Sequence, residues 1–250
     1  MTEAPQPALL LQARGLAISF GGVHAARDIS IDVYEHERLA IIGQNGAGKS
    51  TFLNMCTGYL RPEAGQVVYR ARDITRLTPH EIARLGIARA FQHPQVFIEH
   101  TVLDNLRFAS SACGGFWQGW RGVRSPRYDD KARELAALFR LESVTEKRVS
   151  ETSEGTRKLL DIAMALALEP RLLMLDEPTS GVSAEDKFKV MDTLRDALDI
   201  RGVAAVFVEH DMDVVRNYAE RVAVWVEGRI LAAGPPDDVL HDPRVLESVL

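Results

Sequence analysis

The sequence has few cysteines and no long hydrophobic run. Two of its 250 residues are cysteine, Cys56 and Cys113, and their spacing forms no C-x-x-C motif. We expect reduced thiols, as in cytosolic proteins, rather than a fold held together by disulfides. No apolar run approaches the roughly 18–20 residues that cross a bilayer. Any association with a membrane would therefore depend on a partner.

Positive charge is not in excess either. The 30 Lys and Arg residues are outnumbered by 35 Asp and Glu residues, which gives a formal net charge of −5 at pH 7. This balance argues against a broad basic surface, and hence against nucleic acid as a partner. Residues 1–7 lack the basic segment of a signal peptide. With 46% hydrophobic and 26% charged residues, the composition is that of an ordinary globular protein.

What the sequence does contain is a phosphate-binding motif of the form G-x-x-x-x-G-K-[ST], which lies between a strand-type run and a helix-type run. Its candidate binding residues are Gly43, Asn45, Gly46, Ala47, Gly48, Lys49, Ser50 and Thr51. The glycines allow backbone N–H groups to turn toward a phosphate chain. Lys49 would face the β- and γ-phosphates, and the Ser50 hydroxyl could ligate Mg²⁺. The motif predicts binding of a nucleoside triphosphate such as ATP.

Short apolar runs predict two kinds of sheet. Runs at 9–14, 16–20 and 29–34, separated by glycines, indicate an antiparallel sheet laid against the P-loop region. The runs at 172–175 and 203–208 are almost wholly apolar, which is typical of buried parallel strands.

The remaining segments are mainly helical. We predict a helical subdomain over about 93–150, inserted into an α/β core formed by about 9–92 and 151–250. A Gly- and Trp-rich excursion at 110–128 would either form a partner surface or fold its aromatic rings back onto the helices. A helix over 157–167 should bury one face. That face consists of Leu159, Leu160, Ala163, Leu166 and Ala167.

Polar residues follow three of the expected parallel strands. They are Gln92, the pair Asp176-Glu177, and His210. Because open parallel sheets bind ligands at the carboxyl ends of their strands, we expect these groups to meet one γ-phosphate. Asp176 would hold Mg²⁺, Glu177 would polarise the attacking water, and His210 would bond the γ-phosphate or orient that water.

The order of these motifs resembles the nucleotide-binding subunit of an ABC transporter, from about Leu9 onward. The resemblance implies the ABC ATPase fold: a P-loop NTPase core with a mainly parallel sheet, an N-terminal antiparallel β-subdomain and a helical insert. It also implies that Phe20 stacks on adenine, although the residues alone favour a plain core position. Gln92 would act in catalysis and as a Mg²⁺ ligand, and His210 would be the switch histidine. Residues 180–183 would form the D-loop.

One branch of the family is especially similar. Residues 86–92, 208–212 and 242–245 resemble the ATP-binding subunits of importers for branched-chain amino acids and related amides or urea. The resemblance implies a second ATP-binding cassette, in a homodimer or a heterodimer. It also implies transmembrane permease subunits and, indirectly, a periplasmic solute-binding protein. It places the chain at the cytoplasmic face of the inner membrane.

The signature segment departs from the family pattern, which is usually Leu-Ser-Gly-Gly-Gln. Here residues 152–156 retain only Ser153 and Gly155, which would contact the ATP held by the other cassette. Glu154 replaces a glycine. Its carboxylate would either meet the arriving γ-phosphate of the opposite site or turn away, into solvent or toward Arg157.

Other functions share part of this pattern. An exporter or lipopolysaccharide-extracting cassette would carry most of the same motifs. A soluble ABC ATPase acting on nucleic acid or ribosomes is disfavoured by the single cassette and the acidic balance. A nucleotide-binding module without hydrolysis is disfavoured because Glu177 and His210 are both present.

Overall fold

The computed structural model describes residues 8–112 and 125–249. The segment 113–124 includes Cys113 and most of the Gly- and Trp-rich excursion. The expectations for that excursion and for the Cys113 thiol therefore lie outside the described residues.

Four strands from the first part of the sequence form a small sheet, and they pair antiparallel throughout. Its strands, in spatial order, are β2 (Val23–Tyr34), β1 (Leu9–Phe20), β4 (Ala64–Tyr69) and β5 (Arg72–Asp73). The expected break at Gly15 is wrong, because β1 continues through it. Gly15 has a φ of +59°, and the pairing with β2 shifts between Ala13 and Leu16. Glycine here forms a bulge rather than ending the strand.

A six-stranded sheet forms the centre of the molecule. Its strands, in spatial order, are β10 (Arg229–Gly234), β9 (Arg221–Val226), β3 (Arg38–Gly43), β8 (Ala204–Val208), β7 (Leu172–Asp176) and β6 (Ile87–Ala90). Neighbours from β9 to β6 run parallel, and β10 pairs antiparallel with β9. Every residue of β7 and β8 is buried, in agreement with the two apolar runs in the sequence.

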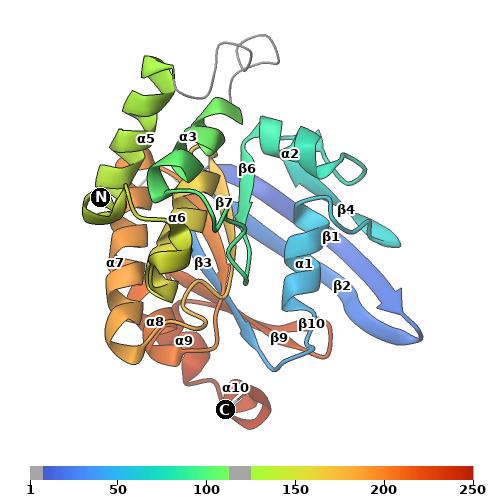
Figure 1. Cartoon of the computed structure of the whole chain (residues 1–250). Helices are drawn as coiled ribbons and strands as arrows, with labels where there is room; N and C mark the ends of the chain where they lie inside the picture. Colours follow the sequence, from blue (N-terminus) through green and yellow to red (C-terminus); the bar gives the residue numbers. More distant parts are fainter. Residues whose placement is uncertain (1–7, 113–124, 250) are drawn as a thin grey trace, which may run out of the picture.

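Helices cover both faces of this sheet (Figure 1). Those before the excursion are α1 (Lys49–Cys56), α2 (Pro79–Leu85) and α3 (Val102–Ala112). Those after it are α5 (Pro126–Leu138), α6 (Glu154–Leu166), α7 (Ala184–Arg201), α8 (Met212–Tyr218), α9 (Pro236–Leu240) and α10 (Pro243–Val249), with short 3₁₀ turns at Glu142–Val144 and Val149–Glu151. Among the described helices, none is long and apolar enough to cross a membrane.

Two hydrophobic cores lie on opposite faces of the large sheet. On β3, Ala40 and Ile42 belong to the core shared with α3, α5, α6 and α7, whereas Leu39 and Ile41 belong to the core shared with α1 and the small sheet. Successive side chains of a strand point to opposite faces, so one strand contributes to both cores. Figure 1 shows the same division, with α3, α5, α6 and α7 on one side of β3 and α1 with β1 and β2 on the other. The carboxyl ends of β3, β6, β7 and β8 therefore emerge between these two layers.

Candidate nucleotide-binding site

The P-loop joins β3 to α1, and close packing requires two of its glycines. A Cβ atom at Gly48 would lie 1.9 Å from the carbonyl oxygen of Ala25, and one at Gly43 would lie 2.2 Å from that of Trp225. Both glycines also have positive φ, +97° and +147°. A side chain at either position would force the loop away from its neighbours.

Lys49 is buried against the loop that precedes it. Its Nζ atom donates to the carbonyl oxygens of Gly43 at 2.7 Å and Gln44 at 2.9 Å. Burial lowers the pKa of Lys49, although the carboxylates of Glu177 and Asp176 oppose this by raising it. The ammonium group is thus held at the P-loop, near both acidic residues of the expected site.

Ser50 and Asp176 are directly bonded. The Ser50 hydroxyl donates to Asp176 Oδ1 at 3.1 Å, and Arg89 Nη2 donates to Asp176 Oδ2 at 2.9 Å. The side chains of Asp176 and Arg89 are both only 7% exposed. Mg²⁺ prefers hydroxyl and carboxylate oxygens as ligands. The Ser50 hydroxyl and the Asp176 carboxylate therefore suit a magnesium ion.

Glu177 lies at the meeting point of the other expected groups. Its Oε2 accepts from Gln92 Nε2 at 2.7 Å, and its Oε1 lies 2.9 Å from His210 Nε2. Its backbone has a φ of +50°, in the left-handed region that non-glycine residues rarely adopt. The structure brings the three residues together as the sequence led us to expect, and their chemical roles remain predictions.

Three expected binding residues stand apart from this cluster. Phe20 ends β1 and is 47% exposed, on the same hairpin as Ala25, which packs against Gly48. Ser153 caps α6, its Oγ accepting from the backbone N–H of Thr156 at 3.3 Å, and Gly155 lies in the first turn of that helix. No hydrogen bond or ion pair in the described residues joins these three to Lys49 or Glu177.

The Glu154 side chain lies beside Arg157 and the D-loop. Its Oε2 is 3.7 Å from Arg157 Nη1. Its Cγ atom is 3.4 Å from where a Cβ atom on Gly181 would be. Of the two orientations considered from the sequence, the structure shows the one in which Glu154 pairs with Arg157.

One buried carboxylate was not assigned a role from the sequence. Glu209 is 3% exposed, and its Oε1 accepts from both the backbone N–H and the hydroxyl of Thr179, at 3.1 and 2.7 Å. Its Oε2 accepts from the backbone N–H of His210 at 3.1 Å. Burial raises the pKa of Glu209, and these hydrogen bonds oppose the rise. The sequence does contain one signal for Glu209, namely that a charged residue directly follows a wholly apolar strand.

The buried face of α6 differs from the expected one. Leu159 is only partly buried, whereas Lys158 and Asp161 are 2% and 6% exposed. The pattern of apolar residues places Lys158 and Asp161 outside the core, so their burial overturns part of that expectation. Their partners include the segment 91–95, which follows β6.

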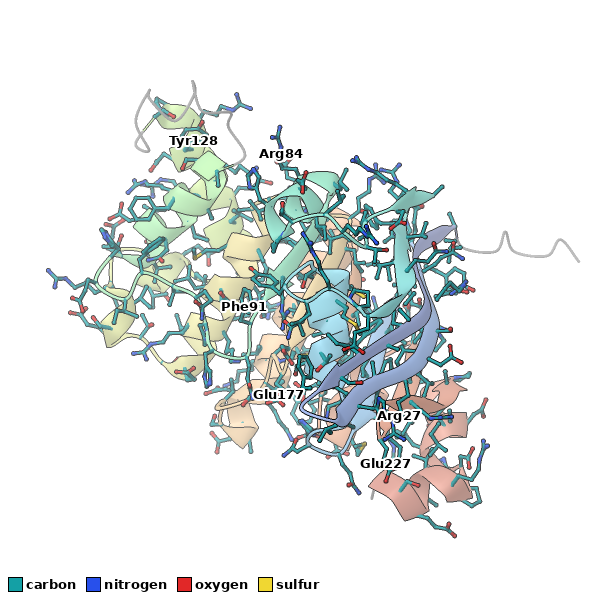
Figure 2. The ribbon with its side chains drawn as sticks, turned by 90° about the vertical axis from the view of Figure 1, so that its right-hand side faces the viewer. Arg27, Arg84, Phe91, Tyr128, Glu177 and Glu227 are labelled. Atoms are coloured by element: carbon teal, nitrogen blue, oxygen red, sulfur yellow. The ribbon has the colours of Figure 1, made fainter. Side chains whose placement is uncertain are left out.

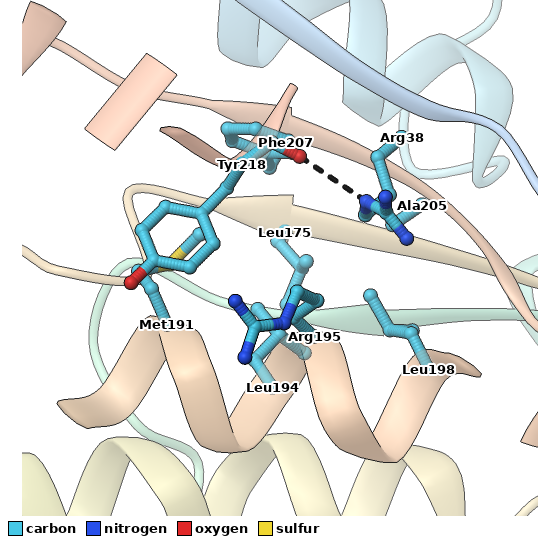
Figure 3. Close-up of a pocket in the computed structure, with 9 residues that line it drawn as sticks. All are labelled: Arg38, Leu175, Met191, Leu194, Arg195, Leu198, Ala205, Phe207 and Tyr218. Carbon is cyan, nitrogen blue, oxygen red and sulfur yellow. Dashed lines mark hydrogen bonds between the residues drawn. The ribbon is translucent and has the colours of Figure 1, made fainter. Parts of the chain in front are cut away.

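A small cavity of about 10 Å³ lies between α7 and the strands β7 and β8 (Figure 3). Arg38, Arg195 and Tyr218 are among the residues that line it, and Arg38 Nε donates to the Tyr218 carbonyl oxygen at 3.2 Å. This volume suffices for about one water molecule. None of the residues that line it belongs to the expected nucleotide site.

The fold and this arrangement define a P-loop ATPase of the ATP-binding-cassette class. A model of the ABC transporter family matches residues 26–180. A probable branched-chain amino acid transport ATP-binding protein, LivG of Archaeoglobus fulgidus, is 33% identical over 96% of this chain and 95% of its own length. The lipopolysaccharide export system ATP-binding protein LptB of Acidithiobacillus ferridurans is 30% identical over 96% of each.

A solved structure agrees with these relatives. The ADP conformation of an ATP-binding cassette of an ABC transporter superposes with a TM-score of 0.84, at 31% identity over 96% of this chain and 97% of its own. The chain therefore belongs to the ABC transporter family and has the ABC ATPase fold. It is an ATP-binding, ATP-hydrolysing subunit of an ABC transporter.

Proposed function

We propose that this subunit powers the import of branched-chain amino acids or related small polar solutes. The relative from Archaeoglobus, which matches almost end to end, supports this substrate class. The single structural observation that carries the ATPase chemistry is the position of Glu177 between Gln92 and His210.

ATP binding would use the P-loop. The N–H groups after Gly43 and at the start of α1 would surround the phosphates, with the positive end of the helix aimed at them. Lys49 would leave the carbonyl oxygens of Gly43 and Gln44 for the β- and γ-phosphate oxygens, because these carry more negative charge. Phe20, exposed at the end of β1, is available to stack on the adenine.

Hydrolysis would use Glu177 to orient and deprotonate the attacking water. Both of its carboxylate oxygens are already engaged, one by Gln92 and the other by His210. Water can bind Glu177 when one of these partners turns to the γ-phosphate. The water oxygen then attacks phosphorus in line, its proton passes to Glu177, and ADP leaves.

Magnesium would be held by Ser50 and Asp176, with the Gln92 side chain as a further oxygen ligand. When bound, it would neutralise charge on the β- and γ-phosphate oxygens. The hydrogen bond from Ser50 to Asp176 and the absence of soft ligands at this pair fit such an ion.

The proposed assembly joins two cassettes head to tail. Ser153 and Gly155 of one would contact the ATP on the P-loop of the other. Transmembrane permease subunits would dock near Gln92 and the helical subdomain of about 93–150, at the cytoplasmic face of the inner membrane. A periplasmic solute-binding protein would deliver the solute, and nucleic acid would take no part.

The test is co-purification of this chain with candidate transmembrane permease subunits, followed by an ATPase assay in lipid nanodiscs. We expect leucine, isoleucine or valine, with the matching binding protein, to stimulate turnover. Lipopolysaccharide export is the second candidate, because the LptB relative matches over the same share of the chain. Stimulation by lipopolysaccharide and not by amino acids would replace the first proposal with the second.

A further inference from the structure

Helix α6 carries two buried charges, Lys158 and Asp161, three residues apart. Residues with this spacing lie on neighbouring positions of one helix face. A buried charge without partners strongly destabilises a protein, so the groups that bond to these two charges are essential to their burial. Both side chains reach the segment that follows β6, which contains Gln92.

Asp161 binds both ends of that segment. Its Oδ2 accepts from the backbone N–H of Phe91 at 3.2 Å, and its Oδ1 accepts from the backbone N–H of Gln95 at 2.9 Å. Burial raises the pKa of Asp161 to about 6, although both N–H groups oppose the rise. The turn over 91–95 is thus tied at its first and last residues to one side chain of α6.

Lys158 binds the main chain of both members of the catalytic pair. Its Nζ atom donates to the carbonyl oxygen of Gln92 and, at 3.2 Å, to that of Glu177. The Gln92 and Glu177 side chains are themselves bonded at 2.7 Å. One ammonium group therefore fixes the two backbones whose side chains must meet. Figure 2 shows Phe91 and Glu177, in that view, between the green and yellow helices and the blue strands.

Glu177 needs such support because its backbone is strained. A left-handed conformation is unfavourable for a non-glycine residue and persists only where its surroundings enforce it. The Glu177 N–H donates to the Val208 carbonyl oxygen at 3.0 Å, which fixes one side of the residue. Lys158 fixes the other side through the Glu177 carbonyl oxygen.

We propose that Lys158 and Asp161 are positioning residues that hold Gln92 and Glu177 in their catalytic arrangement. Neither residue has a hydrogen bond or ion pair to the P-loop. Their loss should therefore slow turnover and leave ATP affinity intact. The same helix begins at Ser153 and Glu154, so the helix that serves the partner's ATP also holds this chain's own catalytic pair. The catalytic part of this inference rests on the proposed function, whereas the hold on residues 91–95 does not.

The experiment uses the full chain in complex with its membrane subunits. Lys158→Met and Asp161→Ala remove the two contacts, and Lys158→Arg restores a donor. Lys131→Met is the matched control, because it removes an ammonium group that pairs with Glu169 and bonds nothing in 91–95. Three quantities are measured: hydrogen exchange of the amides in 91–95, turnover at saturating ATP, and affinity for a fluorescent ATP analogue.

We expect the amides of Phe91 and Gln95 to exchange at least about tenfold faster in Asp161→Ala, since each loses its acceptor. Lys158→Met should lower turnover about 10- to 100-fold while ATP affinity stays within about twofold. Lys158→Arg should recover part of the turnover, and Lys131→Met should match the wild type in all three measurements.

Three results would overturn the inference: unchanged exchange in Asp161→Ala, wild-type turnover in Lys158→Met, or a parallel fall in ATP affinity. Should Lys158→Met fail to fold, exchange in Asp161→Ala still decides whether the hold exists. A wild-type complex that hydrolyses no ATP would contradict the proposed function, while the exchange measurement would judge the hold separately.

Discussion

The expected ATP site has two halves, which differ sharply in how this chain holds them. The first half is the P-loop with the strand ends, and the second half is the start of α6. At the P-loop and strand ends, Lys49 and Asp176 are buried, and their polar atoms are bonded within the chain. At the start of α6, Ser153 is exposed, and among the described residues its hydroxyl is hydrogen-bonded to Thr156 alone. The first half is organised before any ligand arrives. The second is an exposed helix start, as we expect where another chain brings the nucleotide.

The largest effect we expect is from Glu177→Gln, which tests whether the first half carries the chemistry. The amide keeps the shape but accepts no proton, so turnover should fall by about 100- to 10,000-fold. ATP affinity should remain within about twofold, because Glu177 does not bind the P-loop. Single-turnover assays and titration with a fluorescent ATP analogue measure the two quantities. If turnover and ATP affinity fell equally, Glu177 would not be a residue that acts in catalysis alone.

Lys49→Ala should give the next largest effect, and it should lower ATP affinity rather than turnover. Removing the ammonium group takes away charge-assisted hydrogen bonds to the phosphates, which are worth about 1.5–3 kcal/mol. Affinity for ATP should fall about 10- to 150-fold. The same titration checks this, and unchanged affinity would show that the Gly43–Gly48 loop does not bind phosphate through Lys49.

Ser153→Ala should affect the second half alone. Loss of the cap should destabilise the fold by about 1 kcal/mol, and turnover in the complex should fall about threefold to tenfold. ATP affinity of the isolated chain should not change. Thr78→Ala is the control, because Thr78 caps α2 in the same way, away from both halves. If the two variants lose turnover equally, the effect of Ser153 is only on stability.

Glu154→Gln should have the smallest effect. Its carboxylate pairs with Arg157 at 3.7 Å and is 40% exposed, and such surface pairs contribute about 0–1 kcal/mol. We expect turnover to change by less than about twofold. A rise of fivefold or more in the steady-state ATPase assay would show that Glu154 repels the partner's γ-phosphate after all.

Much of the first half could be predicted from the sequence because its signals are local. The P-loop spacing identifies Lys49 and Ser50. The apolar runs indicate which strands are buried and parallel, and therefore that Gln92, Glu177 and His210 emerge at one edge. The start of α2 is equally local, because its capping box joins Thr78 to Glu81, three residues along the chain.

The parts that failed depend on contacts between distant segments. Lys158, Asp161 and Glu209 look like surface charges in the sequence. Each has a hydrogen-bond partner that is distant in the chain: Gln92 for Lys158, Gln95 for Asp161 and Thr179 for Glu209. Burial of a charge becomes favourable only where backbone groups from elsewhere surround it. The bulge at Gly15 similarly depends on pairing with β2, which a glycine by itself does not reveal.

The central claim is that the P-loop and strand-end residues of one chain work with the N-terminal end of α6 from another chain. The direct test mixes two inactive variants, Glu177→Gln and Ser153→Trp, the second of which blocks the exposed end of α6. In a mixed pair, one site combines an intact Glu177 with an intact Ser153. We expect the equimolar mixture to hydrolyse ATP severalfold faster than either variant alone. A rate equal to the mean of the two variants would contradict the account.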